Sequence, residues 1–212
     1  MSASKISVAK KAMSLIKNKL TNNMVLGIGT GSTVNYFIDE LADYKNYFYG
    51  AVSSSEATSK LLIENSIRVL NLNDVNEIEF YIDGADEVSD EEFLIKGGGG
   101  AHTREKIVAS AANEFICIVD KSKLVAELGD FPLPVEVIPE SRSLVSRKIL
   151  AMGGIPKYRE NFITDQGNQI IDIHSLKITN PVDLEKNINS IAGVVDNGIF
   201  AINKPDVVLV SD

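Results

Sequence analysis

Residues 24–41, MVLGIGTGSTVNYFIDEL, contain a complete strand, turn and helix. Met24 to Ile28 is a short apolar run typical of a buried strand, and the apolar residues of 34–41 recur at helical spacing. Between them lies Gly29-Thr30-Gly31-Ser32-Thr33, which is rich in glycine and hydroxyl groups. Backbone N–H groups at a helix start attract anions, so the segment is either an anion-binding loop or a plain tight turn. Its glycines and hydroxyls favour the first.

The neighbouring segments repeat this alternation of strand and helix. Further strands are expected at 50–53, 67–70, 78–82, 93–95 and 115–119, and further helices at 9–20, 57–65 and 105–113. Continuous apolar strands between amphipathic helices are typical of a parallel sheet covered on both faces. We therefore predict a Rossmann-like α/β domain. Its loop at 27–33 is neither a dinucleotide fingerprint nor a Walker A loop, because the required third glycine and the Gly-Lys pair are missing.

The sequence pattern changes after about residue 128. Phe131-Pro132-Leu133-Pro134 is expected to be neither interior helix nor central strand, since proline lacks an N–H donor. Strands then follow at 135–138, 157–163, 169–173 and near 194, with helices at 144–152 and 182–191 and a hairpin turn at 165–168. This β-α-β-β-α-β order is that of a ferredoxin-like α+β domain.

The last apolar run, 206–211, suits a strand that returns to the first sheet. The predicted organisation is therefore a catalytic Rossmann-like domain of residues 1–128 plus 199–212, and a smaller ferredoxin-like domain of residues 129–198.

Composition excludes several classes of function. The chain has 212 residues and a net charge of −8, which argues against nucleic-acid binding because phosphates are bound by clustered Lys and Arg. No apolar run has the length of a membrane span, and the N-terminus lacks a signal-peptide core. One cysteine, Cys117, cannot form an internal disulfide, so we expect a cytoplasmic protein with Cys117 buried in a strand. Neither of the two histidines has a partner at metal-ligand spacing, so no metal site is expected.

Carboxylates follow the expected strand 78–82. Asp83-Gly84-Ala85-Asp86-Glu87 would lie at the carboxyl end of a parallel sheet, where such sheets bind ligands. Asp83 and Asp86 suit hydrogen bonds to sugar hydroxyls, or a hard metal ion. The alternative is a solvated acidic turn, and the place at the sheet edge favours function. Ser53 to Thr58, at another strand-to-helix junction, is explained equally well by helix capping or by ligand binding.

A lysine and four glycines follow the next expected strand. Lys96 suits the stabilisation of negative charge on a substrate oxygen, and the amides of 97–100 suit close contact with a ligand. Glu105, at the start of the following helix, suits a general base if burial or a neighbouring carboxylate raises its pKa. Taken alone, it is equally an ordinary first-turn acid.

In their order and spacing, these segments resemble the A type of ribose-5-phosphate isomerase across nearly the whole chain. The matching pieces are 29–33, 53–58, 83–87, 96–106, 120–125, 132–137, 164–168 and 193–200. The resemblance implies an intramolecular oxidoreductase that interconverts D-ribose 5-phosphate and D-ribulose 5-phosphate through an enediolate, in the non-oxidative branch of the pentose phosphate pathway. It implies no metal or organic cofactor, and a homodimer or homotetramer.

The resemblance also implies site residues. Glu105 falls on the family's catalytic base. For the mechanism we hypothesise that Lys96 stabilises the enediolate oxygen and that Asp83 assists ring opening. The substrate-contacting positions are Thr30, Gly31, Ser32, Thr33, Asp83, Gly84, Ala85, Asp86, Lys96, Gly97, Gly98, Gly99 and Lys123. Lys10 is a further candidate near the site. His102 and Gln166 depart from the family's usual residues, and neither carries an assigned chemical role.

Two other functions fit the same framework. One is a non-catalytic sugar-phosphate sensor, although the chain lacks a helix-turn-helix with basic flanks. The other is an acyl or coenzyme A transferase with a glutamate nucleophile. Turnover of ribose 5-phosphate to a ketose separates the isomerase from both.

Overall fold

The computed structural model describes residues 2–211. The chain packs into two compact units. One runs through Gly84 and takes in Arg104–Lys123 and the C-terminal segment from Pro205, and the other comprises Ala85–Thr103 and Leu124–Lys204. The domain boundaries expected at residues 128 and 199 stay a prediction, and each unit is described by itself below.

The first unit is built on a parallel sheet. Its five strands are ordered β12-β6-β3-β1-β2. Their bounds are β1 (Val25–Ile28), β2 (Gly50–Ser53), β3 (Ile78–Asp83), β6 (Ala112–Val119) and β12 (Val207–Val210). All neighbouring pairs are parallel, with Ile28 opposite Ile82 and Asp83 opposite Cys117. The Rossmann-like sheet is confirmed, as is the return of residues 206–211 to it.

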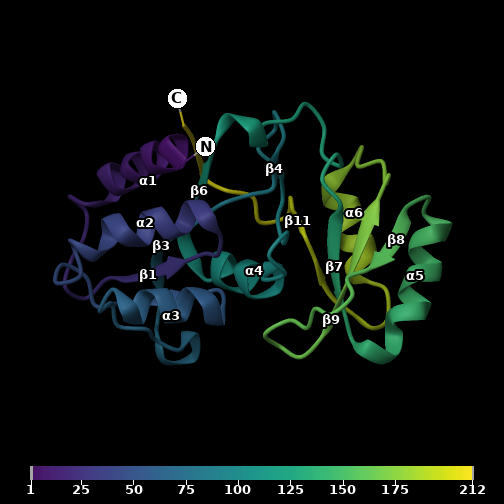
Figure 1. The fold of residues 1–212 in the computed structure, drawn as a ribbon, viewed down its shortest axis with the longest axis horizontal. Helices are drawn as coiled ribbons and strands as arrows, with labels where there is room; N and C mark the ends of the chain where they lie inside the picture. The colour runs from purple at the N-terminus through teal and green to yellow at the C-terminus, as the bar shows by residue number, and fades with distance from the viewer. Residues whose placement is uncertain (1, 212) are drawn as a thin grey trace. The chain divides into compact units, whose positions relative to one another are not determined.

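Four α-helices and two short 3₁₀ segments accompany this sheet. They are α1 (Ser2–Ile16), α2 (Ser32–Ala42), α3 (Glu56–Glu64) and α4 (His102–Ser110), with 3₁₀ turns at Leu72–Asp74 and Lys121–Lys123. Figure 1 shows α1 and α2 lying side by side, and they contact each other along their length. Each strand alternates its side chains between the two faces of the sheet. Ile28 and Ile82 pack in one core with α1 and α2.

The opposite face of the sheet meets α4. A side chain at Gly27 would contact Val108 of α4 and Tyr81 of β3, so all three positions adjoin on this face. Asp83, two residues beyond Tyr81, projects to the same face because the strand period is two. The sheet therefore directs the acidic end of β3 towards the side on which α4 packs.

Three local expectations in this unit are wrong. Residues 67–70 form only an isolated bridge, Val69 with Ala51, and not a strand. The helix expected from Glu105 begins three residues earlier, at His102. The third is the helix expected at 9–20, which spans Ser2–Ile16. At the start of α2, Gly31 holds the N-cap position with φ 134° and no side chain caps the helix, so Ser32 and Thr33 lie inside its first turn.

The second unit contains a four-stranded antiparallel sheet ordered β10-β7-β9-β8. Its elements are β7 (Leu133–Val137), a 3₁₀ turn at Pro139–Ser141, α5 (Arg142–Ala151), β8 (Ile155–Tyr158), β9 (Gln169–His174), α6 (Pro181–Asn189) and β10 (Val194–Asn197). This chain order and strand order confirm the ferredoxin-like α+β pattern. A further sheet joins β4 (Glu87–Val88), β5 (Leu94–Ile95) and β11 (Ile199–Phe200). Residues 93–95 were expected in the parallel sheet, but β5 is antiparallel to both of its neighbours here.

Pro134 lies inside a central strand, contrary to expectation. Its carbonyl accepts a hydrogen bond from the N–H of Gly198 at 2.8 Å, so its own nitrogen faces that same side and not β9. Strand β10 ends at Asn197, whose partner is Val135, and therefore does not reach Pro134. The proline is tolerated because no ladder hydrogen bond to β9 or β10 needs its missing donor.

The strand expected at 157–163 ends at Tyr158. Asn161 adopts φ 55°, a left-handed conformation that breaks an extended strand. The turn at 165–168 is confirmed, with Gly167 at φ 84° donating its N–H to the carbonyl of Thr164 at 2.8 Å. Asn161 therefore makes this hairpin connection longer than its sequence pattern indicates.

Each unit closes over its own hydrophobic core. One core joins α1 and α2 to β1, β3 and β6, and the other lies between α5, α6 and the antiparallel sheet. No helix within residues 2–211 is both long and apolar enough to cross a membrane.

Candidate functional site

The carboxyl end of β3 holds a buried, hydrogen-bonded carboxylate. Asp83 accepts the backbone N–H of Gly84 at 2.7 Å and that of Thr30 at 3.1 Å, both at Oδ1. The hydroxyl of Tyr81 donates to Oδ2 of the same carboxylate. A side chain at Gly29 would occupy the space of the Asp83 carboxylate, so glycine at this position is a requirement of packing. Strand β3 and the loop after β1 together fix Asp83 in one orientation.

Glu105 lies in the first turn of α4 and is 4% exposed. It is three residues before Val108, so both project from the helix face that meets the sheet. Burial raises the pKa of the Tyr81 phenol well above its ordinary value, and the charges of Asp83 and then Glu105 raise it further. Asp83 contacts the Tyr81 phenol directly, and the charge of Glu105 also acts on it. The structure brings Asp83 and Glu105 to the same part of the unit.

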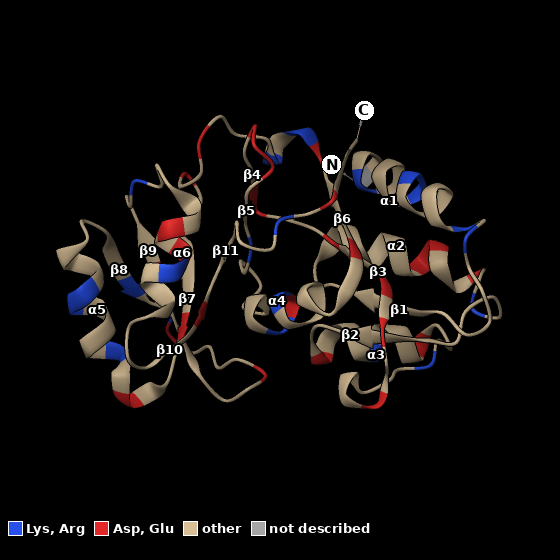
Figure 2. Cartoon of the chain, turned by 180° about the vertical axis from the view of Figure 1, so that it is seen from behind, with Lys and Arg blue, Asp and Glu red and all other residues tan. Residues whose placement is uncertain are grey.

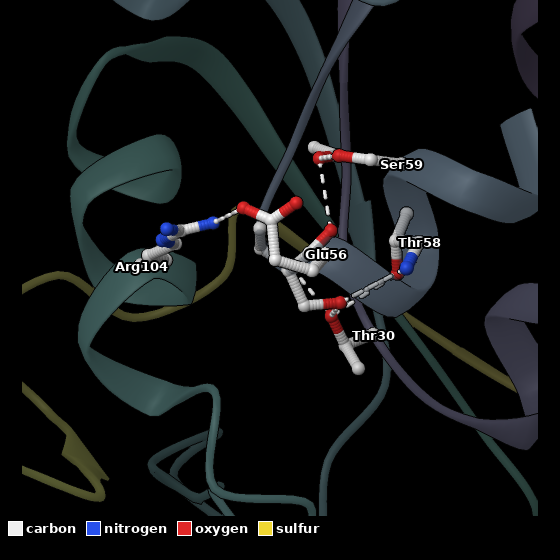
Figure 3. Close-up of polar contacts among 8 residues, drawn as sticks. Thr30, Glu56, Thr58, Ser59 and Arg104 are labelled. Carbon is white, nitrogen blue, oxygen red and sulfur yellow. Dashed lines mark hydrogen bonds and ion pairs between the residues drawn. The ribbon is translucent and has the colours of Figure 1, made fainter. Parts of the chain in front are cut away.

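A cluster of hydroxyl groups holds the loop between β1 and α2 (Figure 3). The Thr30 hydroxyl lies 2.8 Å from the hydroxyls of both Ser54 and Ser55, and Thr58 donates to the carbonyl of Gly29 at 2.8 Å. Ser55 also caps α3 by accepting the N–H of Thr58 at 3.1 Å. Capping is therefore confirmed for this segment. The side chain of Thr30 joins the loop to α3, while its N–H joins the loop to Asp83.

The same view shows an ion pair beside this cluster. Arg104, the residue before Glu105, donates to Glu56 of α3 at 2.8 Å. Figure 2 shows both signs of charge on α4. The pair connects the first turn of α4 to the first turn of α3.

The glycine loop at the start of α2 meets a lysine that the sequence analysis missed. Lys5 of α1 donates to the hydroxyl of Ser32 at 2.7 Å. The pKa of Asp120 is lowered, chiefly by the hydrogen bond from Ser122 and further by the charges of Lys123 and Lys5. Ser32, Lys5 and Lys123 thus gather around one region of this unit. It has a cationic character and the open amides of a helix N-terminus, which together suit a phosphate.

Lys10 does not lie in that region. Its ammonium is 3.8 Å from Glu40, and its side chain is 61% exposed. A signal for Lys5 was present in the sequence, because it continues the apolar stripe of Ala9, Ala12 and Ile16 by one helical turn. A lysine on the inward stripe of a helix points to the interior, whereas Lys10 lies off the stripe.

In the second unit, Lys96 follows β5 and is 2% exposed. Its backbone N–H donates to the carbonyl of Gly198 at 2.9 Å, and its ammonium lies 5.4 Å from the centre of the Phe200 ring. Gly198 and Phe200 thus hold Lys96 through its backbone and its side chain respectively. A buried ammonium is a strong electrostatic group because water does not screen it.

The glycine run is tied to Asp86. The Asp86 carboxylate accepts the N–H of Gly98 at 2.7 Å, and the Asp86 N–H donates to Ile95 at 2.8 Å. Gly97 and Gly100 have φ values of 101° and 79°, which side chains rarely adopt. At two positions of the four-glycine run, the backbone conformation therefore favours glycine over any other residue.

His102 is buried and belongs to the packing of the second unit. Its Nε2 lies 3.4 Å from the carbonyl oxygen of Asp196, and a side chain at Gly97 would contact the imidazole. Cys117 is also buried, as expected from its strand. Within residues 2–211, no three His, Cys, Asp or Glu residues form a group able to hold a metal ion.

A parallel α/β sheet with a buried carboxylate at a strand end, a second buried carboxylate on the helix that packs on it, and an uncapped helix N-terminus near a lysine is typical of enzymes for small anionic substrates. The family model of ribose 5-phosphate isomerase A (phosphoriboisomerase A) matches residues 50–212. The chain belongs to this family.

Solved structures agree with the family match. The ribose 5-phosphate isomerase A of Neisseria gonorrhoeae is 48% identical with a TM-score of 0.92, over 99% of this chain and 92% of that one. The enzyme of Methanocaldococcus jannaschii is 43% identical with a TM-score of 0.92, over 100% and 95% of the two chains. A D-ribose-5-phosphate isomerase solved in complex with phospho-erythronic acid is 36% identical with the same TM-score, over 100% and 95%. These matches do not favour the sensor or the transferase.

Proposed function

We infer that this chain interconverts D-ribose 5-phosphate and D-ribulose 5-phosphate. Membership of the ribose 5-phosphate isomerase A family supports the substrate and the reaction. The structural observation that carries the inference is the pair of buried carboxylates, Asp83 and Glu105, whose charges both act on the Tyr81 phenol. An aldose–ketose isomerase needs one group to move a proton between C2 and C1 and another to assist opening of the sugar ring.

Glu105 is proposed as the base. It removes the C2 proton of the open-chain aldose, and the electrons of the C2–H bond form an enediolate whose negative charge lies on the C1 oxygen. The same carboxylic acid returns the proton to C1, while the proton of the C2 hydroxyl passes to the C1 oxygen, which leaves a ketone at C2. Its place in the first turn of α4 fixes its direction, and its burial keeps water from competing for the proton.

Lys96 is proposed to stabilise the enediolate oxygen, with the amides of the glycine run. Asp83 assists ring opening by exchanging a proton with the sugar. Asp86, whose carboxylate accepts the N–H of Gly98 in the glycine run, orients a sugar hydroxyl. The protein itself orients the residues in these roles, and the roles need no metal or cofactor.

The phosphate is proposed to bind at the N-terminus of α2. Gly31 leaves the amides of the first turn open, and Lys5 and Lys123 supply charge there. Abundant carboxylates and an anionic substrate are compatible in this arrangement, because the acids act on hydroxyls and a C–H bond while the phosphate is held by cations.

A direct assay tests the function. Purified protein is mixed with ribose 5-phosphate and ketose formation is followed with and without a chelator; turnover that the chelator leaves unchanged is expected. Glu105→Gln should lose about 10²–10⁴-fold in turnover. It should still bind phospho-erythronic acid, measured by calorimetry. Glu127→Gln, at an exposed position, is the matched control and should keep wild-type turnover. A Glu105→Gln enzyme of near wild-type rate would remove Glu105 from the role.

The assembly and location are proposed by family resemblance. We propose a homodimer or homotetramer in the cytoplasm. Apolar side chains on α5 and β8 are exposed, including Leu150 at 57% and Ile155 at 49%, and they give a second copy a surface to cover. Sedimentation analysis of the purified protein decides the assembly, and a monomer at all concentrations contradicts it.

A further inference from the structure

We propose that Tyr81 is a positioning residue that holds Asp83 in the orientation needed for sugar ring opening. This proposal rests on the function proposed above and deepens it. No role was assigned to Tyr81 from the sequence, where it is one apolar position of an expected strand. In the structure its hydroxyl donates to Oδ2 of Asp83, while the two backbone amides of Thr30 and Gly84 donate to Oδ1.

The geometry of β3 makes this contact possible. Tyr81 and Asp83 are two residues apart on one strand, so both side chains project from the same face. The ring is fixed by packing, with its centre 5.0 Å from that of Phe115 and with Gly27 directly beside it. A ring held from both sides cannot turn its hydroxyl elsewhere. The hydroxyl is therefore a rigid donor and fixes the second oxygen of the carboxylate.

The protonation state of Tyr81 supports the same role. The groups that act on its phenol are Asp83 on the same strand, Glu105 on α4 and the hydroxyl of Ser54 after β2. Burial and the two carboxylates raise the pKa of the phenol above its ordinary value, so the phenol keeps its proton at neutral pH. Tyr81 is thus a donor to Asp83 and not a base that competes with Glu105.

The chemistry of the two sugars separates this role from a general effect on catalysis. Ribose 5-phosphate is a closed furanose and must open before its C2 proton can be removed. In ribulose 5-phosphate, the oxygen that would close the ring carries the phosphate, so this sugar is already an open chain. Exchange of its C1 hydrogen with D₂O needs only proton removal and return by the base. A residue that acts through ring opening affects the first reaction and spares the second.

The test compares the two reactions on the same protein samples. Tyr81→Phe keeps the ring and its packing and removes only the donor. We expect kcat/KM for ribose 5-phosphate to fall by about 10- to 100-fold, the range for a lost hydrogen bond to a charged group. Deuterium exchange into C1 of ribulose 5-phosphate, followed by NMR, should stay close to wild type. Because exchange reports the folded, active fraction of each sample, a partly misfolded variant is recognised and normalised.

A double-mutant cycle with Asp83→Asn completes the experiment. If Tyr81 acts through Asp83, then Tyr81→Phe adds little to the loss already caused by Asp83→Asn. Tyr44→Phe, a partly buried tyrosine of the same unit, is the control and should leave both reactions unchanged. Equal losses of isomerisation and exchange, or additive losses in the cycle, would overturn the proposal. Wild-type protein that shows neither reaction would instead overturn the proposed function itself.

Discussion

At the scale of single residues, Lys96 is a buried cation whose proposed task is electrostatic. Its ammonium rests near the Phe200 ring and its exposure is 2%. Replacing Lys96 by methionine keeps the length and packing of the side chain but removes its charge. Removal of a donor that stabilises an oxyanion costs about 10²–10³-fold in kcat. We expect that loss for Lys96→Met in steady-state assays with ribose 5-phosphate.

Lys204 provides the matched control for that prediction. Lys204 is exposed. Its ammonium lies 5.6 Å from the centre of the Phe93 ring and donates a hydrogen bond to the carbonyl of Glu91 at 3.0 Å. Lys204→Met therefore removes a similar lysine–aromatic contact without touching a proposed catalytic group, and kcat should not change. Equal effects of the two substitutions would show that Lys96 acts through packing.

At the scale of elements, the N-caps of α3 and α6 allow stability and activity to be separated. Ser55 accepts the N–H of Thr58 at 3.1 Å, and Asn180 accepts the N–H of Asp183 at 3.2 Å. Loss of either cap should lower the free energy of unfolding by about 1 kcal/mol. Only Ser55 also contacts Thr30, so Ser55→Ala should in addition raise KM for ribose 5-phosphate, while Asn180→Ala leaves KM unchanged. Thermal melts measure the stability of both variants, and steady-state kinetics measure their KM. An unchanged KM in Ser55→Ala would show that the hydroxyl cluster has no part in substrate binding.

Glu136 of β7 provides a second element-scale prediction. Its buried carboxylate accepts the hydroxyl of Thr164 and the amide of Asn168, both at 2.8 Å, and also the hydroxyl of Thr103. Glu136→Gln replaces one carboxylate oxygen by an NH₂ group, which cannot accept a hydrogen bond from these donors. The variant therefore loses one hydrogen bond, and its free energy of unfolding should fall by about 1–3 kcal/mol. Urea denaturation measures the difference. Glu140→Gln, at an exposed position, is the control, and equal stability of the two variants would contradict the network.

Some elements of the fold could be predicted from the sequence, and others could not. The strand-loop-helix of 24–41 and the placement of Asp83 at a strand end follow from apolar periodicity, because a parallel sheet aligns its carboxyl ends. Pro134 and Asn161 could not be placed correctly. For Pro134 the answer depends on which side of a strand its nitrogen faces, and for Asn161 on one left-handed residue. The side that Pro134 faces is set by pairing with residues far along the chain, whereas the left-handed conformation of Asn161 leaves no trace in the apolar pattern.

The same limit applied to the site. The carboxylates and the glycine run were recognised as individual motifs, but the link from Tyr81 to Asp83 was not, because a tyrosine within an apolar strand is usually a packing residue. Lys5 is not part of any recognisable motif, and only its place on the apolar stripe of α1 distinguishes it from Lys10.

At the scale of the whole molecule, stability depends on pH through a buried proton. The pKa of Tyr81 is raised by burial and by Asp83 and Glu105, relative to its ordinary value of 10.0. Above that pH the unfolded chain releases the phenolic proton while the folded protein retains it. The unfolded state then binds fewer protons, so the free energy of unfolding falls as pH rises. The contribution is fully present below pH 10 and is lost progressively above it.

Comparison of the wild type with Tyr81→Phe isolates this contribution, because the two proteins share all their lysines and every other tyrosine. The difference in unfolding free energy between them should be constant below about pH 9. Above pH 10 the wild type should lose stability relative to the variant, by about 1.4 kcal/mol per pH unit until the folded phenol itself ionises. Urea denaturation at closely spaced pH values up to about 11 measures the slope. A difference that stays constant across the whole range would mean that the phenol ionises as readily in the folded protein as in the unfolded chain, and the donor role of Tyr81 towards Asp83 would lose its electrostatic basis.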